Sequence, residues 1–140
     1  MKSLIFKVSY DEWNAELQLS ASATLESLAA TILDAAGFAM DHCFGFYDNL
    51  EYPYHSNEEY TLFADMGEAD KPEDTGVRNT RIESVFTPGK TMIFLFDYGD
   101  DWWFPVTCMG EAESRAFKKP KILSTTGTPP EQYPDYEDDD

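Results

Sequence analysis

The fold of this chain is decided around one short run, Asp97-Tyr98-Gly99-Asp100-Asp101-Trp102-Trp103-Phe104. Three carboxylates and a glycine lie among four aromatic side chains, a mixture that is typical of a tight turn on a largely buried hairpin. A two-residue loop, with Gly99 at positive φ, pairs Asp97 with Trp102 and Leu95 with Phe104. This register predicts two faces: one with Ile93, Leu95, Trp102, Phe104, Val106 and Asp97, the other with Phe94, Phe96, Trp103 and Pro105.

Patterns elsewhere in the chain predict the remaining elements. Alternating apolar residues predict a first hairpin over residues 4–8 and 13–19. Helical spacing predicts a helix from an N-cap at Thr24 to Gly37. A third strand is predicted within residues 38–47, beside the first hairpin, and a short strand near Tyr60. Thr80 to Glu83 match a capping box, which predicts a short helix ending near Phe86.

These elements predict an α+β fold with a mixed β-sheet, a packed helix, a long loop excursion over residues 48–76 and a C-terminal hairpin. Residues 1–123 are predicted to form a single domain. Residues 124–140 are predicted to be an acidic, largely flexible C-terminal tail.

Composition restricts the classes of partner. The 140 residues include 27 acidic and 10 basic side chains, so the net charge is −17, while 42% hydrophobic residues argue against global disorder. Such a chain is repelled by nucleic-acid phosphates and by anionic lipids, and it attracts a basic protein or peptide. Neither a signal peptide nor a membrane span is recognisable, which favours a cytoplasmic protein. Cys43 and Cys108 lack zinc-ligand spacing and are interpreted as small buried thiols.

The candidate binding residues are Asp97, Asp100, Asp101, Trp102, Trp103 and His42. The three aspartates also suit a hard cation, which gives the alternative of a metal-dependent hydrolase or nuclease. The geometry of a turn favours a structural role, with Asp97 capping the amides of the turn. No catalytic signature, metal-ligand spacing or cofactor-binding motif is recognisable, so neither a cofactor nor a resident metal is expected.

Four segments, in this order, resemble the plasmid pRiA4b open-reading-frame-three-like domain family. They are His42–Phe46, Phe96–Trp102, Pro120–Leu123 and Gly127–Gln132. The resemblance covers nearly the whole chain and implies a β-grasp, or ubiquitin-like, arrangement in a family that also occurs beside mobile-element genes. The family has no defined molecular function. Two departures remove polar groups: Phe104 stands near where many relatives carry histidine, and Tyr133-Pro134 replaces a Cys-Gly-Gly segment.

Three functional hypotheses follow. A non-enzymatic interaction module, presenting aromatic and acidic groups to a basic protein segment, is favoured over an enzyme. The first alternative is the metal-dependent hydrolase or nuclease that uses Asp97, Asp100 and Asp101. The second is an acidic nucleic-acid mimic, motivated by the net charge of −17. The oligomeric state does not follow from the sequence.

Overall fold

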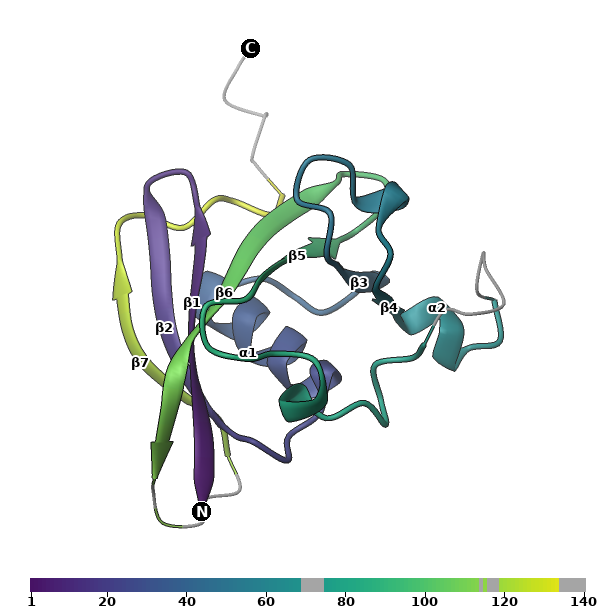
Figure 1. Ribbon diagram of the computed structural model, residues 1–140. Helices are drawn as coiled ribbons and strands as arrows, with labels where there is room; N and C mark the ends of the chain where they lie inside the picture. Colours follow the sequence, from purple (N-terminus) through teal and green to yellow (C-terminus); the bar gives the residue numbers. More distant parts are fainter. Residues whose placement is uncertain (69–74, 114, 116–118, 134–140) are drawn as a thin grey trace.

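A computed structural model describes residues 1–68, 75–113, 115 and 119–133. One seven-stranded sheet dominates the molecule, in the order β4-β3-β5-β6-β1-β2-β7 (Figure 1). Its strands are β1 (Lys2–Tyr10), β2 (Trp13–Ser20), β3 (Phe44–Tyr47), β4 (Glu59–Thr61), β5 (Thr91–Phe96), β6 (Trp102–Glu113) and β7 (Lys121–Thr126). Short helical segments are η1 (Pro53–His55), α2 (Leu62–Asp65) and η2 (Ile82–Ser84), and the one long helix among the described residues is α1 (Leu25–Ala36).

The sheet-dominated α+β class agrees with the sequence prediction, but the described sheet is mostly antiparallel instead of mixed, with one isolated parallel bridge between Tyr60 and Thr75. Every ladder between named strands is antiparallel. Strand β3 pairs with β4 and β5, and β6 occupies the position beside the first hairpin where β3 was predicted. Strand alternation shows which residues face the core, yet it does not identify the neighbouring strand. The β-grasp resemblance is not confirmed by this topology.

Helix α1 forms as predicted and covers one face of the sheet (Figure 1). The Thr24 hydroxyl accepts a hydrogen bond from the Ser27 N–H at 3.1 Å, and Gly37 ends the helix at a φ of 75°. The apolar stripe of the helix is buried against a single large core with the inward residues of β1 and β2. No helix in the described part of the chain is long and apolar enough to cross a membrane.

The predicted register of the β5–β6 hairpin is wrong by one residue. Phe96 pairs with Trp102 and Phe94 with Phe104, so the connection contains five residues, Asp97–Asp101. The left-handed residues are Asp97 (φ 64°) and Asp101 (φ 54°), rather than Gly99. Because side chains alternate along a strand, a slip of one residue exchanges the two faces.

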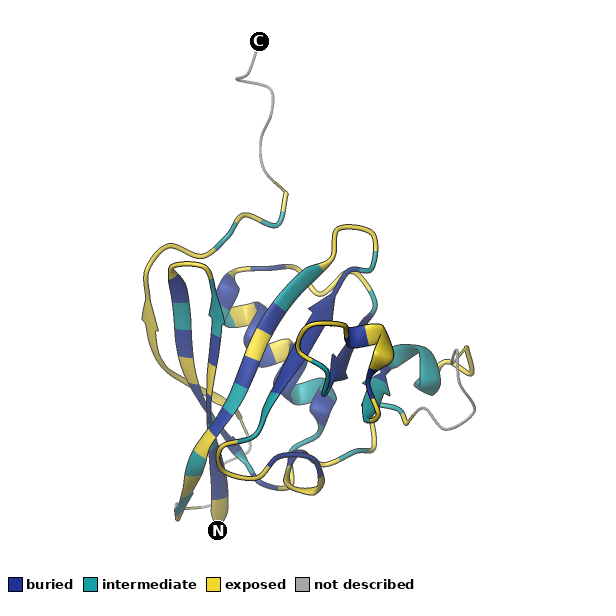
Figure 2. Ribbon diagram, turned by 45° about the horizontal axis from the view of Figure 1, so that its top comes forward, coloured by how far each residue is buried: buried dark blue, intermediate teal, exposed yellow. Residues whose placement is uncertain are grey.

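The observed faces of this hairpin are therefore the reverse of the prediction for β5. Phe94, Phe96 and Phe104 lie in the large core under α1, whereas Ile93 and Leu95 form a small cluster with Tyr47 on the opposite face. The alternation of buried and exposed residues along β6 is visible in Figure 2. Each face of β5 is thus covered, although by different elements.

The predicted capping box is also wrong. The Thr80 hydroxyl donates to the Gly76 carbonyl at 2.6 Å instead of accepting from an amide. The short helix is the 3₁₀ turn η2, whose N-cap residue is Arg81 and has no side-chain cap. A sequence match to Thr-x-x-Glu does not fix the backbone position at which the turn begins.

A substitution at Gly45, in β3, leads to a testable prediction. Because glycine has no side chain, the Tyr98 hydroxyl can lie close to the β3 backbone at this position. A Cβ atom at Gly45 would lie 2.9 Å from the Tyr98 hydroxyl and 3.0 Å from side-chain atoms of Thr61 and Tyr47. We expect Gly45→Ala to lower the free energy of unfolding by about 1–3 kcal/mol through overpacking. Chemical denaturation measures this change. Gly99→Ala is the control and is expected to be neutral, since a Cβ there contacts only Asp97 at 3.4 Å; equal losses would contradict the close-approach explanation.

Candidate functional site

Four segments meet at one end of the sheet, which we call the acidic end. They are the β1–β2 turn (10–13), the segment after α1 (38–43), the β5–β6 turn (97–101) and the segment after β7 (127–133). The Trp102 ring packs against two of these segments: its centroid lies 5.3 Å from that of the Tyr10 ring and 5.1 Å from that of the Phe38 ring. These segments contain no lysine or arginine. Their carboxylates are Asp11, Glu12, Asp41, Asp97, Asp100, Asp101 and Glu131.

Asp97 organises the β5–β6 turn through its side chain and its backbone. Its Oδ1 accepts hydrogen bonds from the N–H groups of Gly99 at 3.1 Å and Asp100 at 3.3 Å. Its carbonyl accepts from the Asp101 N–H at 2.6 Å, and its own N–H donates to the Cys43 carbonyl at 2.9 Å. Aspartate tolerates the left-handed backbone found here. The predicted turn-capping role is present in the structure.

The second oxygen of Asp97 faces His42. His42 Nε2 lies 3.4 Å from Asp97 Oδ2, 3.6 Å from Asp41 Oδ1 and 2.9 Å from the Tyr133 hydroxyl. The Asp97 side chain is 8% exposed, whereas that of His42 is 42% exposed. The imidazole therefore connects an almost buried carboxylate to the surface of the acidic end.

The segment Gly127–Tyr133, which we call the strap, crosses the acidic end after β7 (Figure 1, yellow). The Gln132 side chain accepts from the Ala39 N–H at 2.7 Å and donates to the Ala39 carbonyl at 3.1 Å. It also donates to Asp41 Oδ1 at 3.0 Å, while the Tyr133 hydroxyl donates to Asp41 Oδ2 at 2.8 Å. The strap is thus held by specific side-chain hydrogen bonds.

These contacts bear on the tail predicted from the sequence. Strand β7 pairs with β2 as far as Thr126, so the sheet continues past residue 123. At the start of the strap, Gly127 has a φ of 82°, and a Cβ there would overlap the Glu12 carbonyl oxygen. Only glycine fits this combination of left-handed backbone and close approach. Residues 134–140 of the predicted tail lie outside the described residues.

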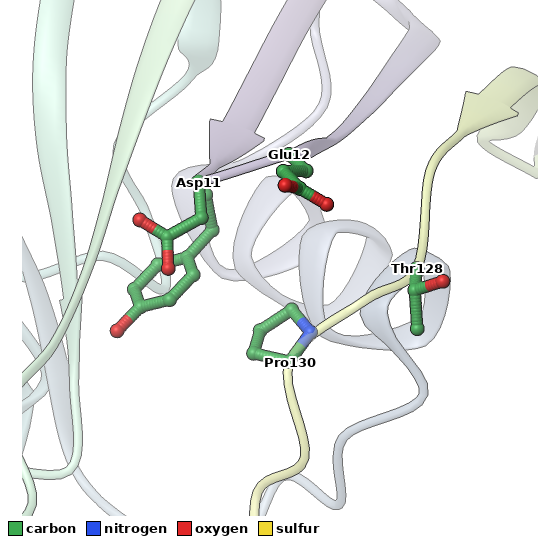
Figure 3. A pocket seen from close by; sticks show the side chains of 5 residues that line it. Asp11, Glu12, Thr128 and Pro130 are labelled. Atoms are coloured by element: carbon green, nitrogen blue, oxygen red, sulfur yellow. The ribbon is translucent and has the colours of Figure 1, made fainter.

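A groove of about 500 Å³ opens between the strap and the β1–β2 turn. Asp11 and Glu12 stand on one side, and Thr128 and Pro130 on the other (Figure 3). Tyr10 also lines the groove and is half-buried. The groove therefore combines two exposed carboxylates with the apolar surfaces of a tyrosine and a proline.

The six predicted binding residues do not form one site. His42 and Asp97 contact each other at the acidic end, where Asp100 and Asp101 are exposed. Trp102 is half-buried on the α1 side, but Trp103 packs on the opposite face of the sheet with Tyr47, Ile93 and Leu95. Both indole N–H groups are buried, and neither has a hydrogen-bond partner among the described residues. Trp103 therefore does not belong to the acidic end.

The sequence prediction missed the residues that complete the acidic end. They are Tyr10, Asp11, Glu12, Asp41, Gln132 and Tyr133. A signal for the strap was present, since Gly127–Gln132 belongs to the motif series of the family resemblance. The positions that the strap contacts lie about 90 to 115 residues earlier in the chain, and local patterns do not reveal contacts of that separation.

Cys43 and Cys108 are free thiols, and burial raises the pKa of each, which lowers the fraction of nucleophilic thiolate at neutral pH. Across residues 1–68, 75–113, 115 and 119–133, no three His, Cys, Asp or Glu side chains are grouped to hold a metal ion.

The strap contact gives a pH prediction. The hydrogen bond from the Tyr133 hydroxyl to Asp41 raises the pKa of Tyr133 to about 12 and lowers the pKa of Asp41 below its usual value of 3.8. The hydrogen bond therefore stabilises the strap fully between about pH 4 and about pH 10, which are the pKa values of Asp41 and Tyr133 in the unfolded chain. This contribution is lost as the pH rises through 10 to about 12, and also as it falls below about 4.

NMR titration of the tyrosine ring carbons measures the Tyr133 pKa directly. We expect Asp41→Asn to return it towards 10, because the neutral amide no longer opposes ionisation of the hydroxyl. Glu51→Gln, which removes an exposed carboxylate elsewhere, is the control and should leave the pKa unchanged. A Tyr133 pKa near 10 in the unmodified protein would show that the hydroxyl does not contact Asp41 in solution.

The fold and the acidic end define a class of protein: a sheet-dominated α+β domain with one helix across the sheet and a carboxylate-rich end crossed by a strap. The family model described as Plasmid pRiA4b ORF-3-like protein matches residues 8–137, and the chain belongs to this family. A search of curated proteins finds no match.

One similar solved structure is the crystal structure of MM3350, a protein of unknown function from Methanosarcina mazei Go1. The two structures have a TM-score of 0.71 and 13% sequence identity, over 91% of this chain and 71% of that one. At this identity the likeness supports the fold alone.

Proposed function

We propose that this protein is a non-enzymatic binding module whose acidic end holds a basic segment of a protein partner. The observation that carries the proposal is the groove beside Asp11 and Glu12, at an end with seven carboxylates and no lysine or arginine. Opposite charge accelerates association and selects partners, while apolar contact adds affinity. Tyr10 and Pro130 offer such contact within the same groove.

The chemistry of the groove favours an extended segment with alternating basic and apolar side chains. Carboxylates at Asp11 and Glu12 attract ammonium or guanidinium groups, and both are exposed enough to keep their hydration until the partner arrives. Tyr10 and Pro130 accept an apolar side chain between two basic ones. We also propose the cytoplasm as the compartment, because the two free thiols suit a reducing environment.

Fluorescence anisotropy tests this function with a defined probe, a fluorescein-labelled eight-residue peptide. Every second residue of the peptide is lysine, and the residues between are serine or leucine. We expect saturable binding that weakens as NaCl rises from about 50 to about 300 mM, because salt screens exposed charges. The matched peptide with glutamate in place of lysine should not bind.

A pair of substitutions locates the site. Asp11→Asn with Glu12→Gln is expected to weaken binding about 3- to 10-fold, corresponding to the loss of two exposed charge contacts. Glu16→Gln with Glu51→Gln removes the same charge away from the groove and should change the affinity less than about twofold. Equal weakening in both pairs would mean that net charge alone attracts the peptide, and no binding would reject the proposal.

A separate measurement tests the alternative of a metal-dependent hydrolase or nuclease. Calorimetric titration with Mg²⁺ and with Mn²⁺ at about millimolar concentration reports whether Asp97, Asp100 and Asp101 bind a hard cation. The nucleic-acid mimic is tested by competition, since a mimic displaces duplex DNA from a DNA-binding partner.

A further inference from the structure

The strap has the properties of a segment that leaves the fold easily. None of its seven residues is buried, and only Pro130 and Gln132 are partly covered. Its hydrogen bonds to Ala39 and Asp41 are exposed, so water replaces them at little net cost when they break. Segments with few apolar contacts and exposed hydrogen bonds open without unfolding the core.

The strap fills the hydrogen-bonding positions that a basic partner would use. Gln132 donates to Asp41 Oδ1 and Tyr133 donates to Asp41 Oδ2, so both carboxylate oxygens already have a donor. A guanidinium group binds a carboxylate through the same two oxygens, with two parallel N–H donors. An arginine side chain therefore competes directly with the two strap side chains, whereas a lysine ammonium offers no planar fork.

We propose that the strap is an internal occupant of the acidic end, which an arginine-bearing segment displaces from Asp41. This inference rests on the proposed binding function and adds the identity of the preferred basic side chain and the means of control. In the closed state Gln132 and Tyr133 hold Asp41. In the open state the arginine fork takes both oxygens, and Asp41 then adds to the attraction exerted by Asp11 and Glu12.

Opening the end of the strap does not remove the groove. Thr128 and Pro130 line the groove, and their position follows from the close approach of Gly127 to Glu12. Gln132 and Tyr133 instead contact the segment after α1. The two attachments can therefore be separated by substitution.

The test uses the full chain and two probes, the lysine peptide above and its arginine counterpart. Gln132→Ala with Tyr133→Phe removes the donors to Asp41 and is expected to bind the arginine probe about 5- to 10-fold more tightly than the unmodified protein. The gain should be smaller for the lysine probe. Adding Asp41→Asn to this variant should abolish both the gain and the preference for arginine.

The unfolding temperature of each variant checks folding, and it should be unchanged because the strap contributes no buried side chain. Gln132→Ala alone is a second opening variant, since it removes the donor to Asp41 Oδ1 without adding charge, and it should act in the same direction. Affinity that is equal to or below that of the unmodified protein in both opening variants overturns the strap proposal alone. Absence of binding by every variant overturns the proposed function and this inference with it.

Discussion

Phe104→Ala is expected to lower the free energy of unfolding by about 3–5 kcal/mol, the largest effect of any substitution considered for this chain. The Phe104 side chain is fully buried in the large core. Its ring centroid lies 5.4 Å from that of Tyr10, 5.8 Å from Phe38 and 6.3 Å from Trp13. Removing the ring leaves a cavity directly beneath two segments of the acidic end.

Urea denaturation measures this loss. Met109→Ala is the control on the same strand, because the Met109 side chain is 54% exposed and its truncation should cost less than about 0.5 kcal/mol. A loss below about 1 kcal/mol for Phe104→Ala would mean that the residue does not lie in the core.

Asp97→Ala is expected to lower the free energy of unfolding by about 2–4 kcal/mol. The substitution removes the acceptor for the amides of Gly99 and Asp100, and hydrogen bonds to a charged group contribute about 1.5–3 kcal/mol. It also places alanine at a φ of 64°, which costs about 1 kcal/mol more.

Asp97→Asn distinguishes the stability contributed by the hydrogen bonds that cap the turn from that contributed by the negative charge of Asp97. Asparagine tolerates the left-handed backbone and keeps an oxygen acceptor at the position of Oδ1, so we expect a loss below about 1 kcal/mol. The comparison is made by urea denaturation at neutral pH. If asparagine and alanine are equally destabilising, the contact between Asp97 and His42, and not the turn cap, carries the stability.

The elements that local patterns specify were predictable. The first hairpin and α1 formed where the spacing of apolar residues placed them, and a short strand formed at Tyr60 as expected. The β5–β6 register was not, because Asp97 leaves the ladder to cap the turn and makes the connection five residues long. Turn length and side-chain capping decide such a register, and a run with one glycine and three aspartates allows more than one solution.

The site was predictable only in part. Sequence reasoning named His42 and Asp97 separately, and the structure brings their side chains within 3.4 Å. Trp102 and Trp103 were both named as candidate binding residues, and the structure places them on opposite faces of the sheet, as the predicted alternation along the strand requires. The contacts of Gln132 with Ala39 and Asp41 join segments that are distant in the chain, and no local periodicity reports them.

The most direct test of the central claim is a two-dimensional ¹⁵N–¹H NMR titration of the full chain with the lysine peptide. Binding at the acidic end predicts shifts concentrated in residues 10–13 and 127–133, with smaller changes at Asp41 and His42. Amides near the exposed Tyr52 and Tyr54, beyond β3, should not move. Shifts centred on Tyr52 and Tyr54, or no shifts in the groove at saturating peptide, would contradict the assignment of the acidic end as the binding site.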